Sequence, residues 1–210
     1  MFIKGNNKIL NRVIAISENL KEQILGNLVR AMDLLLGCQL LAEFMPEVRM
    51  NIAYCLPNPK SVDDVAAIPG RITAYKGQLL VNRYPAFGAS DHLARALIEV
   101  QKFDPAIRAV LNFKYTPELY KWLESYSKRE NFTLVRVDRA AEPSEVRAID
   151  GASMPWKIGK AVEIARNRVP DLMCETEAPG KEPLFKLFGK TATEVATKLI
   201  KIANAWIKRR

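Results

Sequence analysis

The stretch AVLNFKYTPELYKWLESYSKRENFTLVRV, residues 109–137, decides the fold class. Residues 109–114 form an apolar run that predicts a buried strand. Thr-Pro-Glu at residues 116–118 predicts a helix start, because threonine is a good capping residue and proline fits the first helical turn. The helix is expected to end near Lys128, and residues 132–137 predict a second strand. A strand, a helix and a strand in so short a stretch are typical of an α/β protein.

The rest of the chain continues this mixture. A helix is expected from Ser17, kinked or divided at Gly37, and Thr191 with Glu194 forms a capping box that predicts a long C-terminal helix. Lys76-Gly77 predicts a hairpin between two short strands, so the sheet is not expected to be purely parallel. Further strands are expected at residues 50–54, 71–75, 78–82, 172–175 and 184–187, and short helices or helical turns at residues 61–67, 91–101, 142–149 and 158–168.

The composition is that of one globular domain. The chain has 210 residues, of which 49% are hydrophobic and 26% charged. The spacings of Cys38, Cys55 and Cys174 match no zinc pattern, and their odd number argues against a disulfide framework. They are read as reduced thiols of a cytoplasmic protein. The longest apolar cluster, residues 32–41, is too short and too polar to span a bilayer.

The net charge of +9, from 32 Lys and Arg against 23 Asp and Glu, favours anionic partners. Nucleic acid, a membrane surface and phosphorylated small molecules would all fit this charge. The basic residues are scattered, apart from the final residues 208–210, and are not interleaved with aromatic residues. Phosphorylated small molecules are therefore the expected partners, with no nucleic acid and no membrane.

His92, the single histidine of the chain, marks the first candidate site. It follows Ser90 by two residues, in the first turn of an expected helix. Gly88 and Ala89 leave room for close approach of the backbone to a ligand. Free backbone N–H groups and the positive end of the helix would attract a phosphate there, and His92 could donate a hydrogen bond or a proton to it. A solvated histidine near a helix start is the alternative.

Four charged residues are further candidates, each with a plain alternative. Arg71 follows Pro-Gly directly, and its guanidinium could bind two phosphate oxygens, or it could be an ordinary arginine at a strand edge. Arg95 lies one helical turn beyond His92 and could add charge to the same pocket or be solvated. Asp63 and Asp64 could hold Mg²⁺ with substrate phosphates, or simply favour the start of a short helix.

The segment GASMPW, residues 151–156, combines small residues with a proline and a large aromatic. It predicts a shaped loop rather than a disordered connection. Met154 or Trp156 could pack on a flat heteroaromatic ring, or both could belong to the core at a helix start. The residues alone thus indicate a basic α/β domain with a candidate anion pocket near His92.

Several ungapped segments follow one another from residue 50 onward: MNIAY (50–54), SVDDVAAIPGR (61–71), FGASDHLAR (87–95), PAIR (105–108) with Asn112, DR (138–139) with EP (142–143), GASMPW (151–156) and GKEP (180–183). In this order they resemble the ThiN type of thiamine-phosphate synthase, an archaeal type. The resemblance implies a three-layer α/β/α sandwich with a mixed, mainly antiparallel sheet, similar to class II aldolase and epimerase folds. We expect this α/β domain at residues 46–210, with the helical segment at residues 1–45 packed on it.

The resemblance implies a transferase that joins hydroxymethylpyrimidine pyrophosphate to hydroxyethylthiazole phosphate, releasing thiamine phosphate and pyrophosphate. Arg71 and His92 match the residues linked to catalysis in the family, and Mg²⁺ is expected with the pyrophosphate. The residues expected to bind substrate are Asn51, Gly88, Ala89, Ser90, Arg95, Ser153, Met154 and Trp156.

Two other functions are compatible with parts of this pattern. Members of the family that act as thiamine-phosphate sensors tend to lose both catalytic residues and the helix before the domain, whereas this chain retains Arg71, His92 and a helix before residue 44. Aldolases of the similar fold use several histidines to bind metal, which one histidine cannot provide. Ala140 and Ala141 depart from the charged residues usual in the family. A homodimer is the default expectation.

Overall fold

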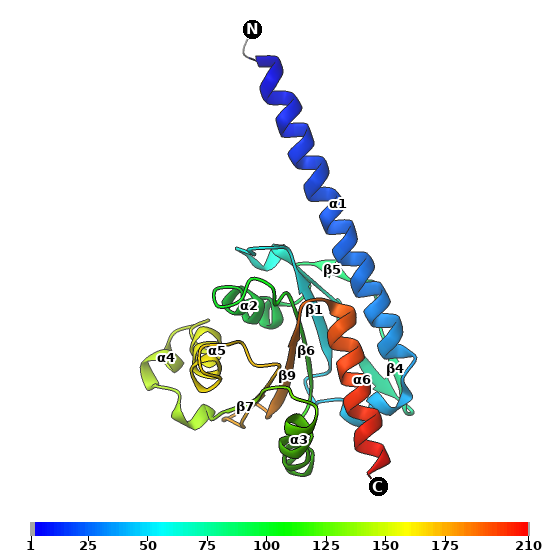
Figure 1. The fold of residues 1–210 in the computed structure, drawn as a ribbon, viewed down its shortest axis with the longest axis vertical. Coiled ribbons are helices and arrows are strands. Elements are labelled where there is room, and N and C mark those ends of the chain that lie inside the picture. Colours follow the sequence, from blue (N-terminus) through cyan, green and yellow to red (C-terminus); the bar gives the residue numbers. More distant parts are fainter. Residues whose placement is uncertain (1–2, 210) are drawn as a thin grey trace.

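The computed structural model describes the backbone of residues 3–209 and the side chains of residues 17–209 (Figure 1). Its main sheet has seven strands: β1 (Asn51–Cys55), β2 (Val65–Ala67), β5 (Ala86–Phe87), β6 (Ala109–Lys114), β7 (Leu134–Val137), β8 (Leu172–Glu175) and β9 (Leu184–Gly189). Their order is β5-β2-β1-β6-β9-β8-β7, and all neighbours are antiparallel except β7 and β8. The predicted mixed, mainly antiparallel sheet is confirmed.

Helices cover both faces of this sheet. One face carries α1 (Ile3–Leu36), the 3₁₀ helix η1 (Gln39–Phe44), α3 (Pro117–Arg129) and α6 (Ala192–Lys208), and the other carries α2 (Asp91–Val100), the short α4 (Ser144–Ala148) and α5 (Ser153–Ile164). The strands alternate accordingly, so that Ile52 and Tyr54 of β1 face the first layer and Ala53 and Cys55 face the second. The result is the predicted three-layer α/β/α sandwich.

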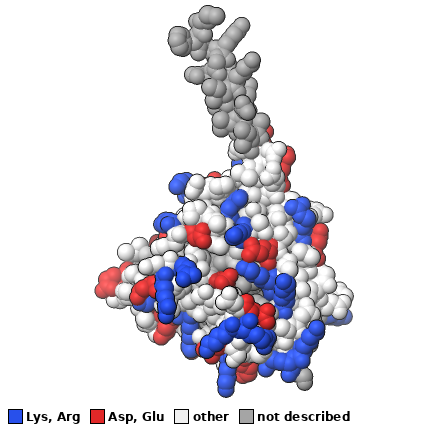
Figure 2. Space-filling model, in the orientation of Figure 1, with Lys and Arg blue, Asp and Glu red and all other residues white. Residues whose placement is uncertain are grey.

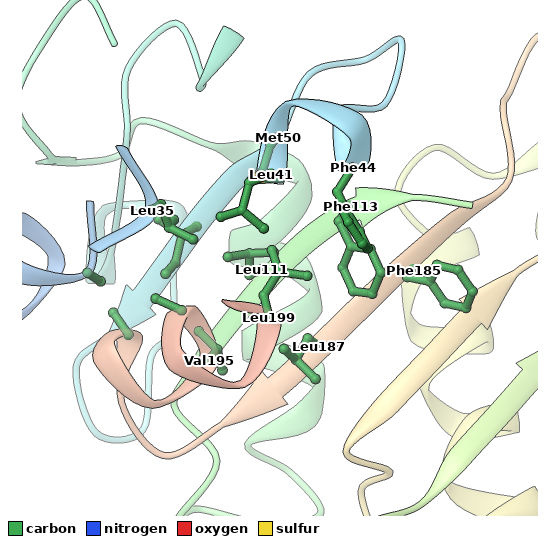
Figure 3. Close-up of a cluster of buried hydrophobic side chains, with 14 of the residues drawn as sticks. Leu35, Leu41, Phe44, Met50, Leu111, Phe113, Phe185, Leu187, Val195 and Leu199 are labelled. Atoms are coloured by element: carbon green, nitrogen blue, oxygen red, sulfur yellow. The ribbon is translucent and has the colours of Figure 1, made fainter. Parts of the chain in front are cut away.

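The larger of the two cores lies between the sheet and the layer of α1 and α6 (Figure 3). Leu35 of α1 and Leu199 of α6 are both fully buried in it. Phe113 of β6 and Phe185 of β9 stack beside them, with ring centroids 4.9 Å apart. The described part of the N-terminal segment thus contributes to this core from Ile24 onward.

The predicted hairpin is present, but it is not part of the main sheet. β3 (Thr73–Tyr75) and β4 (Gln78–Leu80) pair only with each other in a separate two-stranded sheet. Lys76 and Gly77 join them with φ of 49° and 77°, the positive values that a tight hairpin turn requires. The sheet is thus not purely parallel, as expected, but the hairpin is not the reason.

Three local predictions were wrong. Ser17 does not begin a helix, because α1 runs through it without a break. Residues 61–67 are not one helix: η2 (Val62–Asp64) is a single 3₁₀ turn, and the three residues after it are fully buried as β2. The helix expected from residue 158 begins at Ser153 instead, since Pro155 fits in the first turn, where its missing N–H is not needed. Gly37 does divide the N-terminal helix, as predicted.

Charges are mixed on the surface, as the sequence predicts. On the face shown in Figure 2, Lys and Arg are interspersed with Asp and Glu. Among the described residues, none of the helices combines the length and the apolar character needed to cross a bilayer. The three cysteines are unpaired, as expected.

Candidate functional site

A cavity of about 360 Å³ gathers most of the predicted site residues. It lies where α2 and α5 begin, against the face of the sheet that these two helices cover. Arg71 and His92, which lie 21 positions apart in the sequence, both line this cavity. The other predicted residues in its wall are Asn51, Ser90, Arg95, Ser153 and Met154.

The sheet beneath the cavity is polar, although its strands are otherwise apolar. Asn51 of β1 pairs with Asn112 of β6, which pairs in turn with Lys186 of β9. Glu175, at the end of β8, faces the same side, because it lies two residues after Met173 on a strand. All four side chains are buried. Four adjacent strands therefore present hydrogen-bonding groups to one end of the α2 and α5 layer.

Three basic side chains converge on Glu175, and we call Arg139, Lys157 and Lys186 the basic cluster. The Nζ of Lys157 lies 2.9 Å from Glu175 Oε2, and the Nε of Arg139 donates to the same oxygen over 3.1 Å. Lys186 donates to the other oxygen, Oε1. Each of the three is at most 5% exposed. Glu142 is a second buried acid, whose charge acts on Arg139 and Lys157, so the three basic side chains share two buried carboxylates.

Burial makes the protonated forms of these lysines costly. It lowers the pKa of Lys157 to about 7, with the charges of Arg139 and Lys181 as further causes. The pKa of Lys186 is lowered well below its ordinary value, again by burial first and then by Lys157 and Arg139. A bound anion would relieve both effects by pairing with the cations. The site is thus arranged for a multiply charged anion.

His92 is the second residue of α2, whose N-cap is Ser90. His92 is exposed and lines the cavity, where four basic side chains act on it. Desolvation by the surrounding protein, followed by the charges of the basic cluster and of Arg71, lowers the pKa of His92. The imidazole is therefore neutral at physiological pH before an anion binds, and it can donate one N–H.

Arg71 reaches the cavity from a strained backbone position. Its φ of 66° lies in the left-handed region, directly after Gly70 at 75°. Such a conformation costs a non-glycine residue roughly 1–2 kcal/mol. The guanidinium donates to the carbonyl oxygen of Val48, which holds it beside the cavity. Strain that the surroundings maintain at one arginine is typical of a functional position.

Asn51 was predicted to bind substrate, but its amide is occupied by the protein backbone. Its Oδ1 accepts from the N–H groups of Ile52 and Ile68, over 2.8 and 3.1 Å, and its Nδ2 donates to the carbonyl of Ile68. Asn112 continues this network, since it accepts from the N–H of Asn51 and donates to the carbonyl of Arg49. The two asparagines thus fix the backbone next to Arg49 and the turn before Arg71, two arginines of the cavity wall.

Arg95 lies in the wall, as predicted, but its charge is partly neutralised. Its Nε donates to Asp91 of the same helix over 2.8 Å, and this hydrogen bond is the main cause that raises the pKa of Arg95. Gly151 allows the guanidinium to lie close to the backbone, because a Cβ at this position would meet Arg95 Nη1 at 2.4 Å. Arg95 was predicted either to add charge to the pocket or to be solvated. Its pairing with Asp91 favours the second role, at the rim of the cavity.

The acidic pair predicted to hold Mg²⁺ lies outside the cavity wall. Asp64 accepts hydrogen bonds from the backbone N–H groups of Lys60 and Ser61, and these bonds lower its pKa, that of Lys60 most. Asp63 lies beside Gly88, whose Cβ would meet its Oδ1 at 3.0 Å. Residues 17–209 offer no group of three His, Cys, Asp or Glu side chains placed to hold a metal. These donors do not fit a metal site built by the protein.

The remaining predicted residues divide between the wall and its support. Ser90 caps α2, accepting from the N–H of Leu93 over 3.5 Å, and Gly88 and Ala89 precede it outside the wall. Ser153 and Met154 line the cavity from the first turn of α5. Trp156 does not line it and packs against the core between α2 and α5, which is the alternative stated for it.

The sequence profile described as Thiamine-phosphate synthase ThiN matches residues 27–201. The chain belongs to this family. It is 35% identical over 180 residues to "Thiamine-phosphate synthase ThiN" of Methanothermobacter thermautotrophicus, covering 86% of this chain and 92% of that protein. The predicted resemblance to ThiN is confirmed. The match starts within α1, so the boundary expected near residue 45 divides a region that the family shares.

Two further relatives contain ThiN-like sequence within a longer protein or as an isolated domain. Identity is 37% over 180 residues to "Bifunctional thiamine biosynthesis protein ThiDN" of Methanocaldococcus jannaschii, covering 85% of this chain but only 40% of that protein. The solved C-terminal domain of a phosphomethylpyrimidine kinase superposes with a TM-score of 0.83 at 33% identity, covering 87% of this chain and 99% of that one. The fold described above is thus also that of a solved relative.

Our sequence reasoning did not assign site roles to Arg139, Lys157, Lys186 or Glu175 of this ThiN chain. A signal was present for two of them. Lys186 interrupts the apolar run LFKLFG, and Glu175 ends the apolar run LMCE. A charged residue inside a strand that is buried on both faces needs a partner, so two such strands indicate a buried ion pair.

Proposed function

We propose that this ThiN chain is a thiamine-phosphate synthase. It joins hydroxymethylpyrimidine pyrophosphate to hydroxyethylthiazole phosphate and releases pyrophosphate. The observation that carries the proposal is the shared cavity, in which Arg71 and His92 lie with a basic cluster that suits a diphosphate. The relatives named as thiamine-phosphate synthases support the same reaction.

The reaction breaks the bond between the pyrimidine methylene carbon and a diphosphate oxygen. The bonding electron pair leaves with the diphosphate, and the lone pair of the thiazole nitrogen forms the new carbon–nitrogen bond. Negative charge grows on the departing oxygens, so donors fixed around them lower the barrier. Arg71 binds the phosphates, and the N-terminus of α2 at Ser90 adds its positive end.

His92 acts as a hydrogen-bond donor to the departing diphosphate. Proton donation was the other role predicted for it. Before the diphosphate binds, the lowered pKa favours the neutral ring, whose single N–H can donate to the leaving oxygen. The apolar part of the wall, from Leu93, Met154 and Leu184, is available to the flat rings of the substrates.

The direct test is incubation of the chain with both phosphorylated substrates and Mg²⁺, which diphosphates commonly bind in solution, followed by detection of thiamine phosphate. Arg71→Ala and His92→Ala should each lower kcat by roughly 10²- to 10³-fold, the loss typical of one donor to a developing oxyanion. Lys160→Ala, on the outer part of α5, is the matched control and should retain activity. Near-normal turnover in both site variants would remove these residues from the reaction.

The alternative is a sensor that binds thiamine phosphate without turnover. Retention of both catalytic residues in one cavity, together with α1, supports the enzyme. Calorimetry with thiamine phosphate, run beside the synthase assay, separates the two functions. Tight product binding in a protein that forms no product would establish the sensor.

The cytoplasmic location and the homodimer stay predictions. Light scattering on the purified chain measures the second directly. A mass of one chain at micromolar concentration would exclude a stable dimer.

A further inference from the structure

We infer that Lys157 and Arg139 bind the diphosphate of the pyrimidine substrate, on the side of the cavity next to the sheet. This inference rests on the proposed function, because it assigns residues to one substrate of that reaction. It adds two binding residues to Arg71 and His92. The sequence assigned no role to either of them, although Arg139 belongs to the matching segment DR (138–139) and Lys157 directly follows GASMPW (151–156).

Lys157 and Arg139 lie where a ligand in the cavity can touch them. Lys157 and Arg139 line the cavity although each side chain is only 5% exposed, so their small accessible part is directed at a ligand rather than at bulk solvent. Lys186, directly beneath, is 0% exposed and is not in the wall. The cluster therefore has two members that can touch a ligand and one that supplies charge from below.

Lys157 and Arg139 both have hydrogen-bond donors that their contacts with Glu175 do not use. The structure gives Lys157 one hydrogen bond, to Glu175, of the three that an ammonium can donate. Arg139 uses Nε and Nη2 on Glu175, while its Nη1 makes only a long 3.3 Å contact with the carbonyl of Glu182. Phosphate oxygens accept such charge-assisted bonds readily.

The charges of the basic cluster also suit an anion. Arg139, Lys157 and Lys186 surround Glu175, and Glu142 is a second buried acid that acts on Arg139 and Lys157. Burial disfavours the protonated forms of both lysines, and a bound diphosphate would favour them.

The basic cluster suits the diphosphate of the pyrimidine substrate better than the phosphate of the thiazole. Arg139 and Lys157 line the same cavity as Arg71 and His92. A ligand bound by Arg71 and His92 therefore lies within the field of the basic cluster. Of the two substrates, the one with the larger negative charge and the leaving group gains most from that field.

The test compares Lys157→Met with Lys160→Met, a matched control three residues further along α5 whose ammonium pairs with Glu163 outside the cavity. Inorganic pyrophosphate is titrated into each full-length variant by calorimetry, and KM is measured for each substrate. For Lys157→Met we expect roughly 10- to 100-fold weaker pyrophosphate binding, as for the loss of a hydrogen bond between charged groups. The KM for the pyrimidine substrate should rise, and that for the thiazole phosphate should not.

Arg139→Lys is the second variant, because it keeps a cation beside Glu175 and so preserves the fold. It loses the planar fork that binds two oxygens, and we expect a several-fold loss of pyrophosphate affinity. Unchanged pyrophosphate affinity in both variants, with only a lower melting temperature, would make the cluster a structural ion network and overturn the inference. A rise confined to the KM for thiazole phosphate would overturn it as well.

These outcomes are separable from failure of the proposed function. A wild-type chain that forms no thiamine phosphate refutes the synthase, whatever the variants do. The pyrophosphate titrations need no turnover, so they still decide whether Lys157 and Arg139 bind a diphosphate.

Discussion

Asn51→Ala should damage both stability and activity, although Asn51 needs no contact with substrate. The substitution removes the acceptor of two buried N–H groups, those of Ile52 and Ile68. The carbonyl of Ile68 keeps a second partner, the N–H of Arg71, and so is not orphaned. An unsatisfied buried donor costs about 1–3 kcal/mol, so two of them predict a loss of about 2–6 kcal/mol in the free energy of unfolding. That is a large part of a typical stability of about 5–15 kcal/mol.

The effect on activity follows from where the network leads. Ile68 begins the turn that holds Arg71 in its left-handed conformation, and its carbonyl accepts from the N–H of that arginine. Once Asn51 no longer fixes this turn, the strained conformation has less to maintain it. A displacement of about 1 Å can cost on the order of 10²-fold in rate, so kcat/KM should fall roughly 10- to 100-fold at temperatures where the variant is folded.

Urea unfolding followed by circular dichroism measures the stability, and steady-state kinetics well below the melting temperature measure the activity. Asn82→Ala is the control, since Asn82 is exposed in the segment after the β3–β4 hairpin. It should change the free energy of unfolding by less than about 0.5 kcal/mol. If Asn51→Ala matches this control in both measurements, the network does not fix Arg71 and the reasoning fails.

Three more substitutions test other parts of the structure. Gly151→Ala should cost about 1–2 kcal/mol in urea unfolding, because φ is +80° there and the new Cβ meets Arg95; no loss would contradict the described backbone. Thr116→Ala removes the N-cap of α3 and should lower the free energy of unfolding by about 1 kcal/mol. Unchanged stability would contradict the capping role of Thr116. His92 is protonated more readily in the unfolded chain than in the folded one, so the free energy of unfolding falls as the pH drops below 6.5. Between pH 7 and 5, His92→Gln should lose about 1 kcal/mol less of this free energy than the wild type, with solvent screening taken into account. Parallel pH profiles of the two proteins would contradict the lowered pKa.

The fold was predictable where local signals and burial agree. The strand at residues 109–114 and the helix after Thr116 are present with the predicted cap, because apolar periodicity and capping chemistry are both local. Residues 65–67 were misassigned because VAA carries little strand preference of its own. They form β2 because they pair with β1 and are fully buried, which is a tertiary effect.

The site was half predictable for a similar reason. Arg71 and His92 stand in short segments with their own signals, a Pro-Gly turn and a capped helix start. The apolar runs around Glu175 and Lys186 indicate a buried ion pair, but they do not show that it belongs to the site. Arg139, Lys157, Glu175 and Lys186 become neighbours only when four separate elements pack together. Asn51 was assigned to substrate from its matching segment, and the structure places it in the cavity wall with its amide bound to the backbone. That second role depends on tertiary contacts, which the segment alone does not reveal.

The measurement that tests the cationic cavity most directly is NMR titration of His92, the single histidine of the chain, in protein freed of any affinity tag. Without ligand, we expect its pKa to lie far below 6.5 and the ring to remain neutral at pH 5, because desolvation and four nearby cations disfavour its charged form. Saturating pyrophosphate should neutralise those cations and raise this pKa clearly. A pKa near 6.5 that pyrophosphate leaves unchanged would show that His92 does not share a basic site with Arg71 and the cluster.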